Sequence, residues 1–136
     1  LIPPDKVNMP TIRAYLEAHP DEVTELLDTN PSYIFFRLAD SGPLGSMGQP
    51  ITPWVSLAVD KRVYPMGAPV VFCVPIPGSD HVQGARGLLS GIGMAQDVGG
   101  AIKGSRADLF CGPGELAESV AGNMDVPGDV LLLLAK

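Results

Sequence analysis

The stretch AQDVGGAIKGSRADLF, residues 95–110, decides the fold and raises the first question about function. It predicts two short strands joined by a glycine-rich loop, with Asp97 at the end of the first strand and Asp108 within the second. The loop holds three glycines and two cationic residues: Gly99, Gly100, Gly104, Lys103 and Arg106. Two interpretations are open at this point. Either the segment is an ordinary glycine-rich hairpin, or the glycines shape a loop that holds a carboxylate in place for chemistry.

Length and composition indicate a folded domain without nucleic-acid partners. The chain has 136 residues and is 46% hydrophobic, enough to bury a core, while 16 glycines and 14 prolines favour turns over long helices. The formal net charge is −6 and Lys61–Arg62 is the only adjacent basic pair, so nucleic-acid binding is not expected. No segment reads as a signal peptide or a membrane span. Because the sequence starts with Leu1 rather than Met, this says nothing about compartment.

The two cysteines, Cys73 and Cys111, leave two interpretations open: a disulfide formed in an oxidising compartment, or two buried thiols. Together with His19 and His81 they show no metal-ligand spacing, so no metal site is expected. Neither histidine is well placed as a catalytic base, because His19 adjoins the helix-breaking Pro20 and His81 lies in a polar loop. Carboxylates remain as the candidates for chemistry.

The N-terminal part predicts helices, and the remainder predicts short strands. Asn8 is a good helix cap, and a helical pattern runs from Met9 to Asn30 with a break at Pro20. After Pro31 the pattern changes to short β-branched and aromatic runs separated by turns. The predicted strands span residues 33–38, 56–60, 70–74, 88–96, 107–110 and 130–135, and a small helix spans residues 115–121. Five or six short strands favour a small β-barrel.

Three aspartates touch predicted strands: Asp60, Asp97 and Asp108. Aspartate is depleted in strands, and at a strand end it often caps backbone amides in the following turn. Capping is therefore one interpretation of all three residues, and catalysis is the other.

Two longer stretches resemble a known family. SLAVDKRVYPMGAPV, residues 56–70, and AQDVGGAIKGSRADLFCGPGE, residues 95–115, are similar to the three-aspartate domain of bacterial cell-wall enzymes. With NPSYIFFR and GPLGSMGQPITP, residues 30–37 and 42–53, the match extends to the membrane-bound lytic transglycosylase A family. The lead-in MPTIRAYLEAHPDEVTELL, residues 9–27, resembles the segment that precedes this domain in the same family.

The resemblance implies a fold, an activity and a location. The fold is mainly β with N-terminal helices: a six-stranded double-psi β-barrel of the barwin and endoglucanase type over residues 33–136, after a helical segment over residues 1–32. The activity is cleavage of the β-1,4 bond between N-acetylmuramic acid and N-acetylglucosamine in peptidoglycan glycan strands, without a metal or cofactor. The location is the periplasm, with the family's members typically lipoproteins at the outer membrane.

The resemblance also assigns roles to residues. Asp108 falls on the catalytic acid, Asp97 on its neighbour and Asp60 on the first aspartate of the set. The expected substrate-binding residues are Asp60, Gly99, Gly100, Lys103, Gly104 and Arg106. Cys111 departs from the larger residue expected beside the motif, which changes packing or sugar contact rather than the acid.

A lytic transglycosylase needs one carboxyl group, because the muramic C6 hydroxyl is the nucleophile and closes a 1,6-anhydro ring. Asp108 first protonates the glycosidic oxygen and then accepts the proton of that hydroxyl. We expect burial beside Leu109 and Phe110, and the proximity of Asp97, to keep Asp108 protonated. Lys103 or Arg106 opposes this if it points inward, so we expect one of them to bind a substrate carboxylate instead.

Other aromatic and hydroxyl residues have structural interpretations beside functional ones. Tyr33, Phe35 and Phe36 are predicted to lie in the core. Trp54 either stacks on a sugar or packs under the Pro53 turn, and Ser56 is predicted to cap a turn rather than bind sugar.

Two alternatives to an active enzyme stay open. The chain is either a non-catalytic polysaccharide-binding barrel, or a fragment that needs the N-terminal piece of the same protein, since the family's barrel takes strands from both ends of a longer chain.

Overall fold

The computed structural model describes residues 2–33, 35, 38, 40, 42–76 and 87–135. The chain divides into two compact units, Leu1–Ala39 and Asp40–Lys136. The domain boundary proposed between residues 32 and 33 stays a prediction. The predicted loop over residues 75–84, with His81, lies largely outside the described residues.

The first unit contains the predicted helices. A 3-10 turn, η1 (Pro4–Lys6), precedes α1 (Met9–Ala18) and α2 (Val23–Asp28). Asn8 caps α1 in a reciprocal capping box with Thr11, in which each residue's backbone amide donates to the other's side chain. None of the three segments has a buried residue, so capping and local hydrogen bonds, rather than a core, hold these helices in place.

The strand predicted over residues 33–38 is wrong for the residues that the structure describes there. Tyr33, Phe35 and Leu38 have no strand assignment, and the side chains of Tyr33 and Phe35 are 82% and 86% exposed. The two rings contact each other, with centroids 4.8 Å apart, rather than a core. An aromatic run becomes a strand when a neighbouring strand pairs with it, and among the described residues none does. Phe36 lies outside the described residues.

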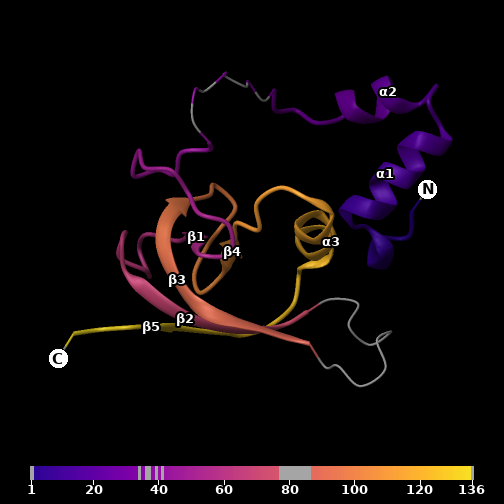
Figure 1. The fold of residues 1–136 in the computed structure, drawn as a ribbon. Coiled ribbons are helices and arrows are strands. Elements are labelled where there is room, and N and C mark those ends of the chain that lie inside the picture. The colour runs from indigo at the N-terminus through magenta and orange to yellow at the C-terminus, as the bar shows by residue number, and fades with distance from the viewer. Residues whose placement is uncertain are drawn as a thin grey trace. The chain divides into compact units, whose positions relative to one another are not determined.

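The second unit is built on one curled five-stranded sheet (Figure 1). Its strands are β1 (Ser56–Val59), β2 (Pro69–Pro75), β3 (Leu88–Val98), β4 (Ala107–Leu109) and β5 (Asp129–Leu132). Their order is β4-β1-β3-β2-β5; β1 runs parallel to β3, and all other pairs are antiparallel. The short helix α3 (Glu115–Asn123) follows β4 along the chain. The predicted mainly-β class is confirmed, with a half-barrel sheet of five strands.

Two apolar clusters support this sheet. The larger one contains six buried residues from β1, β2, β3 and the turn after β1: Leu57, Val59, Tyr64, Val70, Phe72 and Ala95. Met66 and Leu132 pack against it. The smaller cluster joins Cys111 to the α3 residues Ala117 and Val120. Burial of these side chains holds β1 and β3 firmly, and these strands carry the candidate site.

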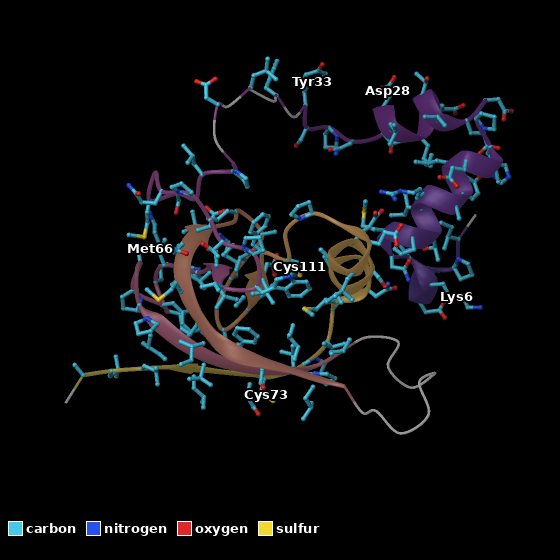
Figure 2. The ribbon with its side chains drawn as sticks, in the orientation of Figure 1. Lys6, Asp28, Tyr33, Met66, Cys73 and Cys111 are labelled. Atoms are coloured by element: carbon cyan, nitrogen blue, oxygen red, sulfur yellow. The ribbon has the colours of Figure 1, made fainter. Side chains whose placement is uncertain are left out.

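The structure shows how Trp54 and the two cysteines are packed. Trp54 is partly buried against the smaller cluster, which agrees with the packing interpretation. Its φ of 62° is unusual for a non-glycine residue, and its amide donates to the Phe110 carbonyl at 2.7 Å. Cys73 and Cys111 are both free thiols (Figure 2), and burial raises the pKa of the Cys111 thiol. The buried-thiol interpretation therefore holds for Cys111, while Cys73 is partly exposed.

Candidate active site beside Ala58

The register of the sheet brings Asp97 and Asp108 together on either side of one residue. Ala58 of β1 is the partner of Asp97 in β3 and also of Asp108 in β4. Directly paired residues point to the same face of a sheet, and neighbouring strands lie about 4.8 Å apart. The Cα atoms of the two aspartates are therefore about 10 Å apart, with a single methyl group between them.

The neighbouring rows of the sheet explain why these carboxylates avoid the core. Leu57 pairs with Ala95 and Leu109, and these three side chains belong to the larger apolar cluster or pack against it. Side chains alternate between faces along β1 and β4, and a register shift between Leu57 and Ala58 makes Asp97 of β3, instead of Gln96, the partner of Ala58, so the row of Ala58 turns away from that cluster. Because the two carboxylates lie on the opposite face, the fold does not have to bury their charges in the apolar cluster.

A pocket of about 190 Å³ lies between the two aspartates. Its lining combines the two carboxylates with residues of β1 and β4, with Ile51 before β1 and with Phe110 after β4: Ile51, Ser56, Leu57, Ala58, Asp97, Asp108, Leu109 and Phe110. Ser56 is buried, accepts a hydrogen bond from the Thr52 amide at 2.8 Å and donates to Gln96. The prediction that Ser56 caps a turn is confirmed, and its hydrogen bond to Gln96 links β1 to β3 beside this pocket.

Asp97 is held in place by backbone amides. Its Oδ1 accepts hydrogen bonds from the Ser46 and Val98 amides, both at 2.9 Å. The Ser46 bond requires the 43–50 loop to approach β3 closely. A Cβ atom at Gly45 would lie 2.4 Å from the Gln96 carbonyl oxygen, so glycine is needed there. Sequence reasoning missed Ser46 and Gly45, because 51 positions separate Ser46 from its partner.

Asp108 is more exposed than predicted. Its side chain is 49% exposed, and Arg106 Nε donates a hydrogen bond to its Oδ1 at 3.0 Å. The expected burial beside Leu109 and Phe110 is wrong, because the strand alternation turns the carboxylate to solvent, and its ionic partner among the described residues is Arg106. The ion pair raises the pKa of Arg106. Arg106 therefore points toward Asp108.

Asp60 differs from the other two aspartates in its surroundings. It is 6% exposed and accepts hydrogen bonds from the Arg62 guanidinium, the Arg62 amide and the Gly104 amide. The Arg62 side chain first, and the Gly104 amide next, hold the pKa of the Asp60 carboxyl well below its usual range. By these bonds Asp60 fastens the glycine-rich loop to the end of β1.

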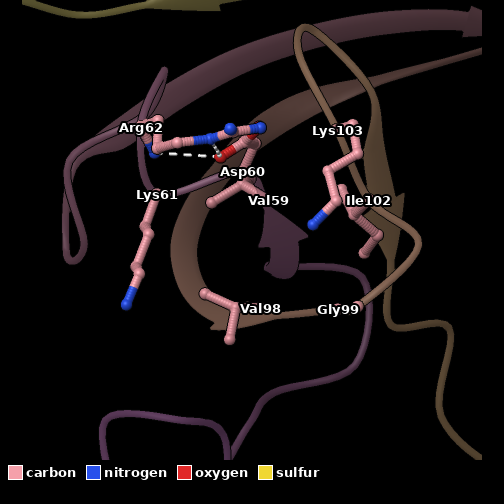
Figure 3. A pocket seen from close by; sticks show the side chains of 9 residues that line it. Val59, Asp60, Lys61, Arg62, Val98, Gly99, Ile102 and Lys103 are labelled. Carbon is pink, nitrogen blue, oxygen red and sulfur yellow. Dashed lines mark hydrogen bonds and ion pairs between the residues drawn. The ribbon is translucent and has the colours of Figure 1, made fainter.

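Four of the six expected substrate-binding residues line a second pocket of about 370 Å³ (Figure 3). They are Asp60, Gly99, Gly100 and Lys103. Gly104 adjoins it through its amide, and its φ of +65° favours glycine. Arg106 lies elsewhere, in a third pocket that it shares with Asp108 and Cys111. The residues of the predicted site are thus divided among neighbouring pockets and do not line a single one.

Within the described residues, no cluster of three or more His, Cys, Asp or Glu side chains is arranged to hold a metal ion. No helix in the part of the chain that the structure describes has the length and apolar character needed to cross a membrane.

Known families and structures match the whole length of this arrangement. The family model described as 3D domain matches residues 55–134, and the model described as MltA specific insert domain matches residues 1–37. Membrane-bound lytic murein transglycosylase A of Vibrio cholerae is 37% identical over 127 residues, which cover 90% of this chain and 34% of that protein.

Solved structures agree with the sequence matches. MltA from Neisseria gonorrhoeae, in a monoclinic form, has a TM-score of 0.75 at 40% identity and covers 90% of this chain and 31% of that one. Escherichia coli MltA with bound chitohexaose has a TM-score of 0.81 at 32% identity and covers 92% of this chain and 38% of that one. The chain therefore belongs to the 3D domain family, among the relatives named membrane-bound lytic murein transglycosylase A. It spans about a third of the length of the curated relatives that it matches.

Proposed function

We propose that this chain is the catalytic part of a lytic transglycosylase that cleaves the β-1,4 bond between N-acetylmuramic acid and N-acetylglucosamine in murein. One observation carries the proposal: Asp97 and Asp108 flank Ala58 and line one pocket. The relatives named lytic murein transglycosylase support the reaction class, and the relative solved with chitohexaose supports a glycan ligand.

The proposed chemistry uses one carboxyl group twice. The protonated Asp108 gives its proton to the glycosidic oxygen, and the bond from that oxygen to muramic C1 breaks. The muramic C6 hydroxyl then forms a bond to C1, and the Asp108 carboxylate accepts the hydroxyl proton. The product carries a 1,6-anhydro ring, the acid is regenerated and no water is consumed. Asp97, fixed by two backbone amides, stabilises the positive charge that develops at C1.

The ion pair between Arg106 and Asp108 suits one half of this reaction and opposes the other. A cation 3.0 Å from Asp108 favours the carboxylate, which suits the second, proton-accepting half. The first half needs the neutral acid, so we propose that the bound glycan separates Arg106 from Asp108. A substrate carboxylate is a suitable alternative partner for the released guanidinium.

We also propose that further polypeptide completes a six-stranded double-psi barrel, as the resemblance implies. Support comes from an apolar row on the outer face of the sheet, where Val71 pairs with both Ile92 and Leu131. Ile92 and Leu131 are exposed, although large apolar side chains are normally covered. The N-terminal part of the same protein is the proposed source of that polypeptide, and the cell envelope, with the periplasm and outer membrane, is the proposed location.

The test is mass spectrometry of the products from purified murein. We expect muropeptides with 1,6-anhydro ends, and a loss of about 10²- to 10⁴-fold in Asp108→Asn. Asp129→Asn is the matched control, because Asp129 is exposed on β5 and has no side-chain hydrogen bond among the described residues. Retained cleavage in Asp108→Asn would remove the assignment of the acid. Hydrolytic reducing ends would show water as the nucleophile, with Asp97 the first candidate for a second catalytic carboxylate.

A chain that binds glycan without cleaving it would favour the non-catalytic binding module instead. Addition of the N-terminal part then separates two cases. Cleavage restored by that part would show that this chain needs a partner, and persistent inactivity would leave binding as the function.

A further inference from the structure

A cationic pocket lies where the parallel strands β1 and β3 both end. Three of the chain's nine Lys and Arg residues line it: Lys61, Arg62 and Lys103. Asp60 is the carboxylate in this lining, and its oxygens are already bonded to Arg62 and to the Gly104 amide. A protein of net charge −6 therefore presents a local excess of positive charge here.

Two of the three cations are available to a ligand. Lys61 and Lys103 are exposed, and neither forms an ion pair within 4.0 Å in the part of the chain that the structure describes. Their side chains extend from opposite sides of the pocket (Figure 3). Arg62 is different, because its guanidinium is held by Asp60 at 2.7 Å. Two separate ammonium groups fit a ligand with more than one carboxylate.

The rest of the lining is apolar or open backbone. Val59, Val98 and Ile102 contribute aliphatic side chains, and Gly100 has no atom within 4 Å of the position where a Cβ would lie. Such a surface accepts a short extended chain with small side chains, rather than a flat aromatic ring. Its volume of about 370 Å³ suits a ligand of a few residues.

This pocket and the pocket that contains Asp97 and Asp108 are lined by consecutive residues of β1 and β3. Ala58 and Asp97 line the pocket with Asp108, and the next residues along the same strands, Val59 and Val98, line the cationic one. One residue along a strand is about 3.3 Å, and an extended peptide advances by a similar distance per residue. Because Val59 belongs to the buried face and Ala58 to the opposite one, a peptide attached to a sugar beside Asp108 reaches Lys61 and Lys103 by passing around the ends of β1 and β3.

We propose that this pocket binds the acidic stem peptide of murein, with its carboxylates at Lys61 and Lys103. The inference rests on the proposed function, because it takes the sugar beside Asp108 to be the muramic acid that carries the peptide. It assigns to the pocket a role in selecting glycan that still carries peptide over bare glycan.

The first test uses the free peptide, so it does not depend on cleavage. The ¹⁵N-labelled chain is titrated with the stem tripeptide Ala–γGlu–diaminopimelate, and amide shifts are followed by NMR. We expect saturable shifts at the amides of residues 59–62 and 98–103, weakened roughly two- to tenfold in the Lys61→Gln/Lys103→Gln double variant. Lys6→Gln, which changes an exposed lysine of the other unit, should bind as the parent chain does.

Three outcomes overturn the inference. They are the absence of shifts in the pocket, equal shifts in the double variant, and equal shifts with inorganic phosphate at the same concentration. The last would mark a general anion site. The result is separable from the proposed function: peptide binding without murein cleavage would keep this pocket and remove the reaction, whereas cleavage without peptide binding would do the reverse.

Discussion

Asp60 and Asp108 illustrate how the same residue type takes different tasks at the scale of single side chains. Asp60 is buried and accepts hydrogen bonds from two backbone amides and a guanidinium. Asp108 is half exposed and has one ionic partner, Arg106. Asp60 therefore has a structural task, the attachment of the glycine-rich loop to the end of β1, whereas the Asp108 carboxylate lies where solvent and a ligand can reach it.

The low pKa of Asp60 predicts acid sensitivity. A carboxyl whose pKa is lowered by folding stabilises the protein above its unfolded pKa of about 3.9, and that contribution is lost as the pH falls below this value toward the folded pKa. We expect Asp60→Asn to lower the free energy of unfolding at neutral pH and to flatten its fall between about pH 4 and pH 2. Urea denaturation at a series of pH values measures both effects. An acid limb in Asp60→Asn as steep as in the parent and in the control Asp129→Asn would contradict this role.

At the scale of elements, the site depends on β1 lying between β3 and β4. The three strands contribute one row, Asp97–Ala58–Asp108, and the next rows on the other face form the core. The small side chain of Ala58 leaves the space between the carboxylates open. We therefore expect that access of a substrate to this pocket depends on Ala58, a residue without chemical function of its own.

Filling that space is expected to abolish activity while the fold is kept. Ala58 is partly exposed, so Ala58→Leu adds three carbon atoms to the pocket without overpacking the buried cluster. We expect loss of murein cleavage by about 100-fold or more, since displacement of a substrate by about 1 Å already has such effects, together with a change of less than about 1 kcal/mol in unfolding free energy. Val71→Leu, a smaller enlargement by one carbon atom on the partly exposed outer row, is the control. If Ala58→Leu cleaved as well as that control, the pocket would not be the substrate site.

The positions of the helices and strands were largely predictable from the sequence, but the order of the strands in the sheet was not. Caps and periodicity locate α1 and α2, and short apolar runs between turns locate the strands from β1 onward. That β1 would separate β3 from β4 depends on contacts about 40 and 50 positions apart, which no local pattern carries. The sequence left open whether Lys103 or Arg106 points toward Asp108, and only the alternation of side chains in the structure showed that Arg106 does. Tyr33 and Phe35 misled the prediction, because an aromatic run reads as a strand whether or not a partner strand is present.

At the scale of the whole molecule, the two compact units differ in how they are stabilised. Unit Asp40–Lys136 contains both buried apolar clusters. Unit Leu1–Ala39 has helices of ten and six residues without a buried side chain. Helices of this length are marginal by themselves in water, because nucleation is costly and each adds few hydrogen bonds. Stability should therefore be uneven along the chain.

Hydrogen exchange followed by mass spectrometry tests this difference. We expect amides of α1 and α2 to exchange faster than those of β1, β2 and β3, by about two orders of magnitude or more, because local opening of an unpacked helix costs little free energy. Asn8→Ala, which removes the cap at a cost of about 1 kcal/mol, should speed exchange in α1 and leave the sheet unchanged. Similar protection in both units would show that the helices share the stability of the sheet.

Because Asp97 and Asp108 both pair with Ala58, the distance between them does not depend on the loop that joins β3 to β4. Asp97 and Asp108 are joined by the glycine-rich loop, yet each is positioned by its own pairing with β1. Insertions or deletions in the loop can therefore reshape the cationic pocket while the separation of the acids is conserved. Substrate preference and the catalytic distance can then be altered one at a time. Under the proposed function, proteins built on this arrangement can diversify in the peptides that they bind while the separation of the two acids stays the same.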